Sequence, residues 1–307
     1  MAPDIALADM TYIAPADLNI LKKIGQGGMG SVSFGTWTSH AVAVKELLPS
    51  GGDEAEQFLQ FQREAYIMSI LHHPNLVKLW GITFAPFRMV MEFVGGGDLD
   101  KFMHPAEQEQ DMSIPQEQFP WDLRYHIAVD IASGMEHLQS IRPPVLHRDL
   151  RPGNVFLTGN PDGPVWAKVA DFGMSRHLAP EIRGALPNWE WLAPEVFGSS
   201  DQYGTASDVY SFGLILLELV TLQRPYTEYR NDERFLSKNT GQQSTASKFS
   251  AMKLKTAILE GLRPTIPEYC PFTLAGLIRK CLLPNPADRP TFTEAKFILT
   301  NLLALEK

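Results

Sequence analysis

The 307-residue sequence contains few cysteines and no long apolar run. Its two cysteines, Cys270 and Cys281, are too few for a disulfide framework and indicate a reducing compartment, so we expect a cytoplasmic protein. The longest apolar helix candidate, residues 209–220, is too short to cross a bilayer and contains Ser211 and Glu218, so we interpret it as a buried helix. We therefore expect no membrane span.

An excess of positive charge is also absent. The net charge of −8 and the pI near 5.5 argue against a protein that binds nucleic acid or anionic membranes in general. The N-terminus lacks a basic-then-apolar signal sequence, and no internal repeat is present. The hydrophobic content of 44% supports a substantial core, and the length fits one large domain or two small ones.

Two carboxylates and one amide stand at the spacing needed for phosphoryl transfer. They lie in the segments HRDLRPGN, residues 147–154, and DFG, residues 171–173. Asp149 can orient a substrate hydroxyl and take its proton, Asn154 can bind a metal from the same loop, and Asp171 can bind that metal from the opposite side. These segments match the established protein-kinase signature.

A glycine-rich segment upstream extends the match. Residues 25–32, GQGGMGSV, fit the pattern G-x-G-x-x-G-x-V, which alone is weak because dinucleotide-binding folds also use G-x-G-x-x-G. A dinucleotide-binding loop opens into a helix, whereas residues 32–37 and 41–45 have strand patterns here. The glycines are therefore predicted to lie in a hairpin over phosphates. Lys45 ends the next strand, where its ammonium can reach the α- and β-phosphate oxygens.

From about residue 18 to residue 303, the chain resembles a eukaryotic protein kinase catalytic domain of the tyrosine-kinase-like group. It is most similar to the Roco (leucine-rich-repeat) kinases, through the segments FQRE (61–64), HPNLVKL (73–79), RMVMEF (88–93) and GLRPTIP (261–267). The resemblance implies a bilobal α+β fold. We expect an N-terminal extension or linker over residues 1–17, a small lobe of antiparallel sheet and one helix over 18–91, a hinge over 92–95, and a larger, mainly helical lobe over 96–307 with inserts near 104–120 and 230–250.

Two helices are predicted from their apolar spacing. The first covers residues 53–71 and would place Glu64 near Lys45. The second covers residues 121–139. The stripes expected to be buried are Phe58, Phe61, Ala65, Met68 and Leu71 in the first, and Ile127, Ile131, Met135 and Leu138 in the second.

The resemblance also implies ATP and Mg²⁺ as cofactors and a set of site residues. The catalytic set is Asp149, Lys45, Glu64, Arg151, Asn154 and Asp171, with Asn154 and Asp171 as metal ligands. Serine/threonine kinases usually carry Lys at the position of Arg151, and Arg keeps the charge but changes the geometry. The nucleotide-binding set is Ile24, Gly25, Gly27, Gly30, Val32, Ala43, Lys45, Met91, Glu92, Val94, Asp98 and Leu157. Met91 matches the gatekeeper, Glu92 and Val94 the hinge backbone, and Asp98 the ribose contact.

Several residues are expected to have structural roles by the same resemblance. Glu195 should pair with Arg289, and Asp208 should cap the backbone near His147. His72 and His73 precede Pro-Asn and are interpreted as an ordinary turn rather than a metal site. The family's regulatory spine corresponds to Met68, Leu79, His147 and Phe172.

The activation segment departs from the usual kinase pattern. Ser175 is the only hydroxyl residue between Gly173 and Ala193, and Asn188 stands where a threonine is usual. Kinases with an arginine like Arg148 usually need a phosphate downstream to neutralise it. Here Glu181 or Glu190 could supply the negative charge, with Trp189 and Trp191 packing the segment, or control could come from elsewhere.

The resemblance implies a protein kinase that transfers the γ-phosphoryl group of ATP to Ser/Thr hydroxyls of protein substrates. A tyrosine or dual-specificity kinase and a pseudokinase scaffold are the alternatives. Further expected partners are a second copy of the chain, through autophosphorylation or dimer formation, and GTPase and repeat domains in the full-length protein.

Overall fold

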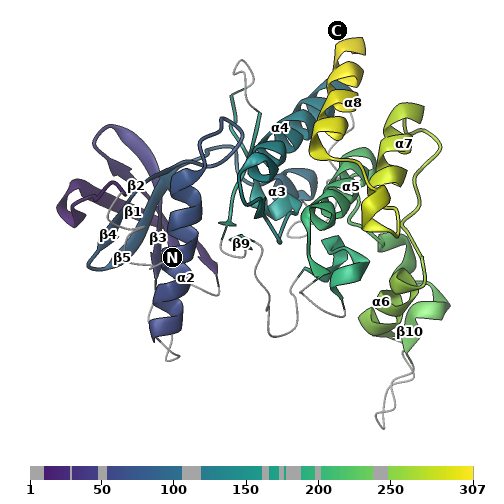
Figure 1. Ribbon diagram of the computed structural model, residues 1–307, viewed down its shortest axis with the longest axis horizontal. Coiled ribbons are helices and arrows are strands. Elements are labelled where there is room, and N and C mark those ends of the chain that lie inside the picture. The colour runs from purple at the N-terminus through teal and green to yellow at the C-terminus, as the bar shows by residue number, and fades with distance from the viewer. Residues whose placement is uncertain are drawn as a thin grey trace.

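Five antiparallel strands and one long helix form the smaller lobe of the computed structural model (Figure 1). The structure describes residues 10–27, 30–47, 54–105, 119–160, 166–172, 176–177, 188–197, 202–237 and 248–306. The strands lie in the order β1-β2-β3-β5-β4. Their bounds are β1 (Leu18–Gly27), β2 (Gly30–Trp37), β3 (His40–Leu47), β4 (Leu79–Phe84) and β5 (Phe87–Glu92).

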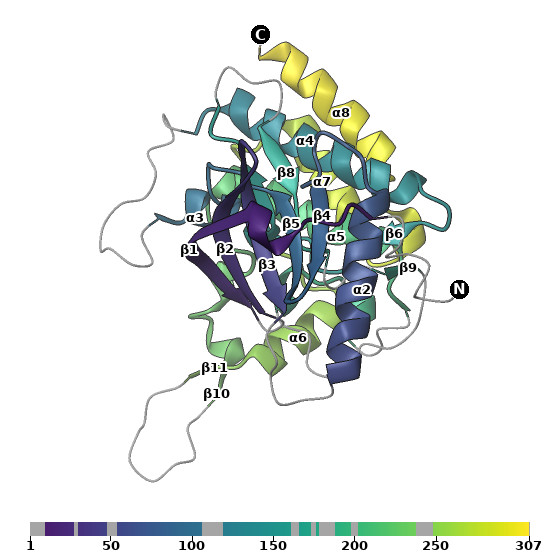
Figure 2. The same ribbon diagram turned by 90° about the vertical axis from the view of Figure 1, so that its left-hand side faces the viewer.

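The helix α2 (Glu54–Ile70) confirms the prediction over residues 53–71 within one residue at each end. It packs beside β4 (Figure 2). Of the predicted stripe, Phe61, Ala65, Met68 and Leu71 are buried. Phe58 is half-buried, and its ring packs against Phe87 with the centroids 4.9 Å apart. The apolar spacing therefore identified the face that meets the sheet.

Part of the expected linker at residues 1–17 is packed structure instead. Residues 1–9 lie outside the described residues, but Tyr12 forms a parallel bridge with Ile82 of β4, and Ile13 is only 1% exposed. A short 3-10 turn, Pro15–Asp17, then leads into β1. The segment was misjudged because its composition of small residues and prolines carries no strand signal.

The larger lobe is mainly helical. Its helices are α3 (Leu99–Met103), α4 (Trp121–Ser140), α5 (Thr205–Thr221), α6 (Ala251–Leu259), α7 (Phe272–Cys281) and α8 (Phe292–Leu305). Short antiparallel pairs join β6 (Val145–Leu146) to β9 (Arg176–His177), β7 (Val155–Leu157) to β8 (Ala167–Val169), and β10 (Leu236–Ser237) to β11 (Lys248–Phe249). The chain thus has the expected α+β fold of two lobes.

Helix α5 forms the centre of the larger lobe. Every residue from 207 to 220 is buried, as expected for a helix that is apolar almost all round. The predicted stripe of α4, which is Ile127, Ile131, Met135 and Leu138, is also fully buried. Within the described ranges, no helix is both long and apolar enough to cross a membrane.

The two expected inserts are described only in part. Residues 106–118 and 238–247 lie outside the described residues. The start of the second insert is ordered, because Phe235 is buried and its ring meets Tyr229 edge-on at 5.6 Å. Phe235 thus anchors the described start of this insert to the core of the larger lobe.

Candidate active site

An ion pair joins the central strand of the small lobe to α2. Nζ of Lys45 lies 2.6 Å from Oε1 of Glu64 and 3.8 Å from Oδ1 of Asp171. Alternation along β3 points the half-buried Ala43 and Lys45 to one face of the sheet and the buried Val42 and Val44 to the other. The strand period therefore delivers the ammonium to the face where Glu64 and Asp171 meet it.

Burial and opposite charge act against each other at this pair. Burial disfavours the Lys45 ammonium, but the carboxylates of Glu64 and Asp171 more than offset it, so the pKa of Lys45 lies above its ordinary value. Burial raises the pKa of Glu64, and the charge of Lys45 counteracts that rise. Lys45 thus keeps its positive charge although its side chain is only 16% exposed.

A second cluster surrounds Asp149 in the loop between β6 and β7. Nδ2 of Asn154 donates to Oδ2 of Asp149 at 2.8 Å, and Nδ2 of Asn188 donates to Oδ1 at 3.3 Å. Nε of Arg151 lies 3.6 Å from Oδ2. Burial raises the pKa of Asp149, with Arg151 and the hydrogen bond from Asn154 opposing the rise. The carboxylate is therefore oriented through both of its oxygens.

The predicted metal ligands supply the chemistry that Mg²⁺ requires. Asn154 donates through Nδ2 to Asp149, which leaves its amide oxygen to bind a cation. Asp171 adds a carboxylate whose side chain is 49% exposed. Oxygen ligands on one or two protein groups are typical of Mg²⁺ sites that also use substrate phosphates. The donor set at these positions fits the ion.

Backbone contacts hold the two clusters together. Asp208, fully buried on α5, accepts from the backbone N–H of His147 at 2.9 Å and of Arg148 at 3.1 Å, which confirms the expected cap. Nδ1 of His147 accepts from the backbone N–H of Asp149, so Nε2 carries the proton and donates to the carbonyl of Ala170 at 3.0 Å. This imidazole joins the loop of Asp149 to the segment that carries Asp171.

The expected regulatory spine is packed. Met68, His147 and Phe172 are buried, and Leu79 packs against the same core. The rings of His147 and Phe172 meet edge-on with centroids 5.5 Å apart.

His73 accepts from the backbone N–H of Asn75, which confirms the predicted turn.

The predicted nucleotide-binding residues come from both lobes. In the small lobe, Gly25 pairs with Val32, Gly27 with Gly30, and Ala43 with Met91. Gly30 has φ 155°, and a Cβ there would lie 2.0 Å from the carbonyl oxygen of Glu46, so only glycine fits. Ile24 is exposed on β1. Residues 28–29 of the glycine loop lie outside the described residues.

The residues that directly follow the hinge pair with β7. The backbone N–H of Gly96 donates to the carbonyl of Leu157, and that of Leu157 donates to Gly97, each at 2.8 Å. This exchange brings Leu157 beside the segment that carries the half-buried Val94. The carboxylate of Glu92, at the end of β5, lies 3.0 Å from Nζ of Lys168 on β8. The hinge and β8 are therefore also linked by an ion pair.

Asp98 has a structural contact that the sequence analysis missed. Its side chain caps α3 by accepting from the backbone N–H of Lys101 at 2.9 Å, and it pairs with Nζ of the same lysine. An aspartate directly before a short helix was the available signal.

A buried carboxylate was also missed as an organising group. Glu218 of α5 is 0% exposed, and its Oε2 accepts from the indole N–H of Trp191 at 3.0 Å. Its Oε1 lies 2.8 Å from Nε2 of His104, which follows α3. Burial raises the pKa of Glu218, and the contact with His104 opposes that rise. A lone glutamate in an apolar helix must find partners, and this one connects α3 to the end of the activation segment.

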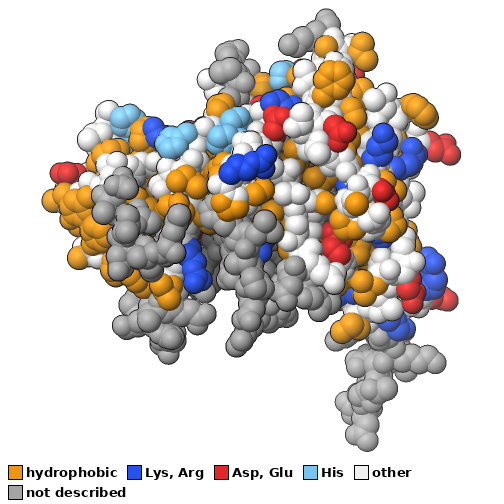
Figure 3. Space-filling view, in the orientation of Figure 1, with side chains coloured by type: hydrophobic (Ala, Val, Ile, Leu, Met, Phe, Trp, Pro, Cys, Tyr) orange, Lys and Arg blue, Asp and Glu red, His pale blue; other side chains and the backbone are white. Residues whose placement is uncertain are grey.

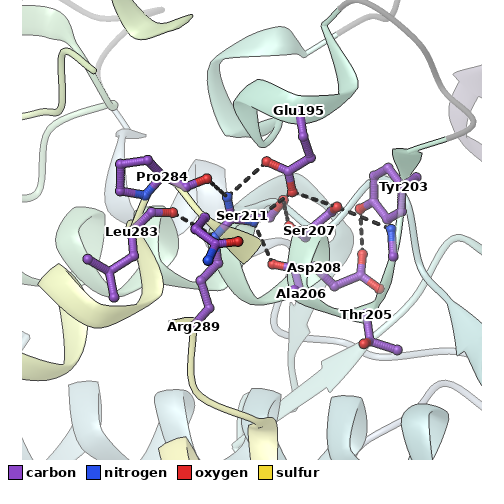
Figure 4. Close-up of polar contacts among 12 residues, drawn as sticks. Glu195, Tyr203, Thr205, Ala206, Ser207, Asp208, Ser211, Leu283, Pro284 and Arg289 are labelled. Carbon is purple, nitrogen blue, oxygen red and sulfur yellow. Dashed lines mark hydrogen bonds and ion pairs between the residues drawn. The ribbon is translucent and has the colours of Figure 1, made fainter. Parts of the chain in front are cut away.

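Glu195 and Arg289 form the expected pair (Figure 4). Nη1 and Nη2 of Arg289 lie 2.6 and 2.8 Å from the two carboxylate oxygens. Burial would raise the pKa of Glu195, but the hydrogen bonds and charge of Arg289 outweigh it and lower that pKa. Ser207 of α5 donates to the same carboxylate, so residues 194–196 are fastened to the helical core.

Comparison with known proteins agrees with this geometry. The family model of protein tyrosine and serine/threonine kinases matches residues 18–299. Relatives from Dictyostelium discoideum include "Probable serine/threonine-protein kinase roco11", 36% identical over 98% of this chain and 19% of the relative. Two others are "Probable serine/threonine-protein kinase qkgA", 34% identical over 99% of this chain and 20% of the relative, and "Probable serine/threonine-protein kinase roco6", 39% identical over 89% and 12%.

The expected resemblance to Roco kinases is thereby confirmed. The chain spans a fifth or less of the length of these relatives, whose shares are 19%, 20% and 12%. Because the family model covers nearly the whole chain, the chain belongs to the protein tyrosine and serine/threonine kinase family.

Proposed function

We propose that this chain is the catalytic domain of an ATP- and Mg²⁺-dependent protein kinase that phosphorylates Ser/Thr hydroxyls of proteins. The observation that carries the proposal is the contact of Lys45 with both Glu64, at 2.6 Å, and Asp171, at 3.8 Å. This arrangement unites a phosphate-binding lysine, the helix that orients it and a metal ligand, all of which phosphoryl transfer in kinases requires.

The site residues then divide into roles. Lys45 binds the α- and β-phosphates and Glu64 orients it. Asn154 and Asp171 hold Mg²⁺, which when bound neutralises charge on the phosphate oxygens. Asp149 positions the substrate hydroxyl and accepts its proton. Arg151, whose Nε lies 3.6 Å from Oδ2 of Asp149, places positive charge beside the transferred group.

The nucleotide would lie between the lobes. We place the adenine between the side chains above it and Leu157 below, with the backbone of the hinge reading its edge and Met91 at its rear. Asp98 would reach the ribose, although its contact with Lys101 must then rearrange or be shared. The residues above the adenine are Ile24, Val32 and Ala43, the hinge residues are Glu92 and Val94, and the phosphates would lie under Gly25, Gly27 and Gly30.

Specificity for Ser/Thr is supported by the names of the Roco relatives. The departure at Arg151 keeps dual specificity as the second candidate. The intact set from Lys45 to Asp171 argues against a pseudokinase scaffold. We further propose a cytoplasmic protein with GTPase and repeat domains beside this one. Control would come from such a domain or from a second copy of the chain moving α2, since Ser175, outside the described residues, is the only hydroxyl in the activation segment before Ala193.

Incubation with labelled ATP, Mg²⁺ and generic protein substrates, followed by phosphoamino-acid analysis, tests the proposal. Phosphoserine and phosphothreonine are expected, and Asp171→Ala should abolish their formation without loss of fold. Phosphotyrosine in comparable amount would establish dual specificity. Binding of Mg²⁺-ATP without any transfer would leave only the scaffold.

A further inference from the structure

The residues before β1 pair with the outer edge of the small-lobe sheet through a single bridge. The backbone N–H of Ile13 donates to the carbonyl of Ile82 at 2.9 Å, and the N–H of Ile82 donates to the carbonyl of Thr11 at 3.0 Å. These two bonds flank the parallel bridge between Tyr12 and Ile82. The open edge of β4 is thereby paired over this stretch, which satisfies backbone groups that an edge strand would otherwise expose.

The sheet is shaped to receive this segment. Ile13 is 1% exposed and packs in one apolar cluster with Val42, Val44 and Val90. Opposite it, Gly81 of β4 has no side chain, and a Cβ there would lie 2.4 Å from the carbonyl oxygen of Thr11 and 3.0 Å from two carbons of Ile13. Glycine at position 81 is therefore required for docking.

One row of paired residues leads from this segment to the candidate active site. Tyr12 pairs with Ile82, Ile82 with Met89 of β5, and Met89 with Lys45 of β3. Ile82 and Met89 are 0% and 1% exposed. They belong to the same core as Phe61, Ala65 and Met68, the inner face of the helix that carries Glu64. The docked segment is thus connected to the Lys45–Glu64 pair through the paired backbone of β4 and β5, whereas the Ile13 side chain packs on the opposite face of the sheet.

The outer end of the segment is accessible. Tyr12 is 55% and Phe84 43% exposed, and their rings stack with centroids 5.6 Å apart at an interplanar angle of 12°. Figure 3 shows hydrophobic side chains gathered at this end of the small lobe, where β4 and β5 lie in Figure 1. The segment is thus fixed by the buried Ile13 at its C-terminal end and by the exposed stack of Tyr12 on Phe84.

We infer that residues 11–13 are a positioning element for Lys45 and Glu64, so that undocking this segment weakens nucleotide binding and turnover. The inference rests on the proposed function for its kinetic readout. It assigns the segment an action through β4 and β5 and no contact with nucleotide or substrate. Displacement of the segment would then reach the ion pair through the paired residues Ile82 and Met89.

Two substitutions undock the segment from opposite sides. Ile13→Asp places a charge in the apolar cluster, and Gly81→Ala fills the space that Thr11 and Ile13 occupy. Each substitution should raise KM for ATP about tenfold and lower kcat. The rates are measured well below the melting temperature of each variant. Ile13→Ala serves as the milder variant if Ile13→Asp does not fold. Affinity for Mg²⁺-ATP, measured by calorimetry, should fall in parallel.

A double-mutant cycle with Glu64→Gln separates positioning from simple loss of stability. If the segment acts through the ion pair, Glu64→Gln should lower kcat/KM for ATP by a smaller factor in the Gly81→Ala background than in the wild type. The matched control is Leu299→Ala in α8, which is buried in the larger lobe and should lower the melting temperature while KM for ATP stays unchanged.

The outcomes distinguish the two proposals. The positioning role would be overturned if the variants lowered only the melting temperature, as the control does, and if their effects on kcat/KM were additive with that of Glu64→Gln. A wild-type chain without transfer activity would overturn the proposed function alone, because the calorimetric affinities would still show whether the segment positions Lys45.

Discussion

Nδ2 of Asn188 donates to Oδ1 of Asp149 at 3.3 Å, which joins the activation segment directly to the catalytic loop. Asn188 has φ 57° and ψ 37°, in the left-handed region. Asparagine tolerates this region, whereas a β-branched residue is strained in it. The structure thus accounts for asparagine at a position where threonine is usual: the left-handed backbone disfavours threonine, and the amide supplies the hydrogen bond to Asp149.

Replacing Asn188 by Gly tests this contact because glycine keeps the left-handed backbone and removes the amide. A hydrogen bond to a charged group contributes about 1.5–3 kcal/mol, so we expect kcat to fall by about tenfold or more, with KM for ATP unchanged. Asn188→Thr should lower the melting temperature further than Asn188→Gly, since only threonine strains the backbone. Wild-type kcat in Asn188→Gly would show that the contact has no part in turnover.

Lys45→Met and Glu64→Gln should both slow turnover, with the greater loss in Lys45→Met. Lys45 would contact the phosphate directly, whereas Glu64 only orients Lys45, from 2.6 Å away. Steady-state rates at saturating and limiting ATP measure the two effects. If Glu64→Gln proved as severe as Lys45→Met, Glu64 would need a direct part in the chemistry.

His104→Leu removes one partner of the buried Glu218 carboxylate, whose other oxygen holds the indole of Trp191 at 3.0 Å. The loss of a partner costs a buried carboxylate about 1–3 kcal/mol. Because Trp191 packs the segment expected to position the peptide, we expect KM for a peptide substrate to rise roughly tenfold while KM for ATP stays unchanged. His104→Gln keeps an N–H donor and should restore much of the affinity. His126→Gln on α4 is the matched control. Equal losses in both KM values would point to general unfolding instead.

Stability should depend on pH through Glu195. Its pKa is lowered in the folded chain, so its contribution is complete above the ordinary value of 4.5 and is lost as the pH falls through the lower folded value. Glu195→Gln leaves the buried Arg289 without its counter-charge, which should cost on the order of 3 kcal/mol near neutral pH. Denaturant unfolding should show this difference shrinking below pH 4.5. A difference independent of pH would contradict the ion-pair explanation.

Local patterns were enough to predict what depends on near neighbours. The helix around Glu64 and the loop around Asp149 follow from short-range spacing, and both were predicted. Glu218 and His104 are 114 residues apart, and neither carries a motif that reveals the other. The burial of Ile13 depends on a glycine at position 81, so residues 11–13 looked like a linker when considered alone. Asp98 was assigned only to a ligand because its helix-capping role was not considered.

The two cysteines have a consequence for chemical labelling. Burial raises the pKa of the Cys270 thiol to about 11 and that of Cys281 to about 12, so both stay protonated and poorly nucleophilic at neutral pH. Cys281 is the last residue of α7 and Cys270 lies two residues before its start, and none of the segments that carry Lys45, Asp149 or Asp171 contains a cysteine. A thiol-directed covalent inhibitor would find no native target at this site. A single cysteine engineered at Met91 would therefore be a selective attachment point for such a compound.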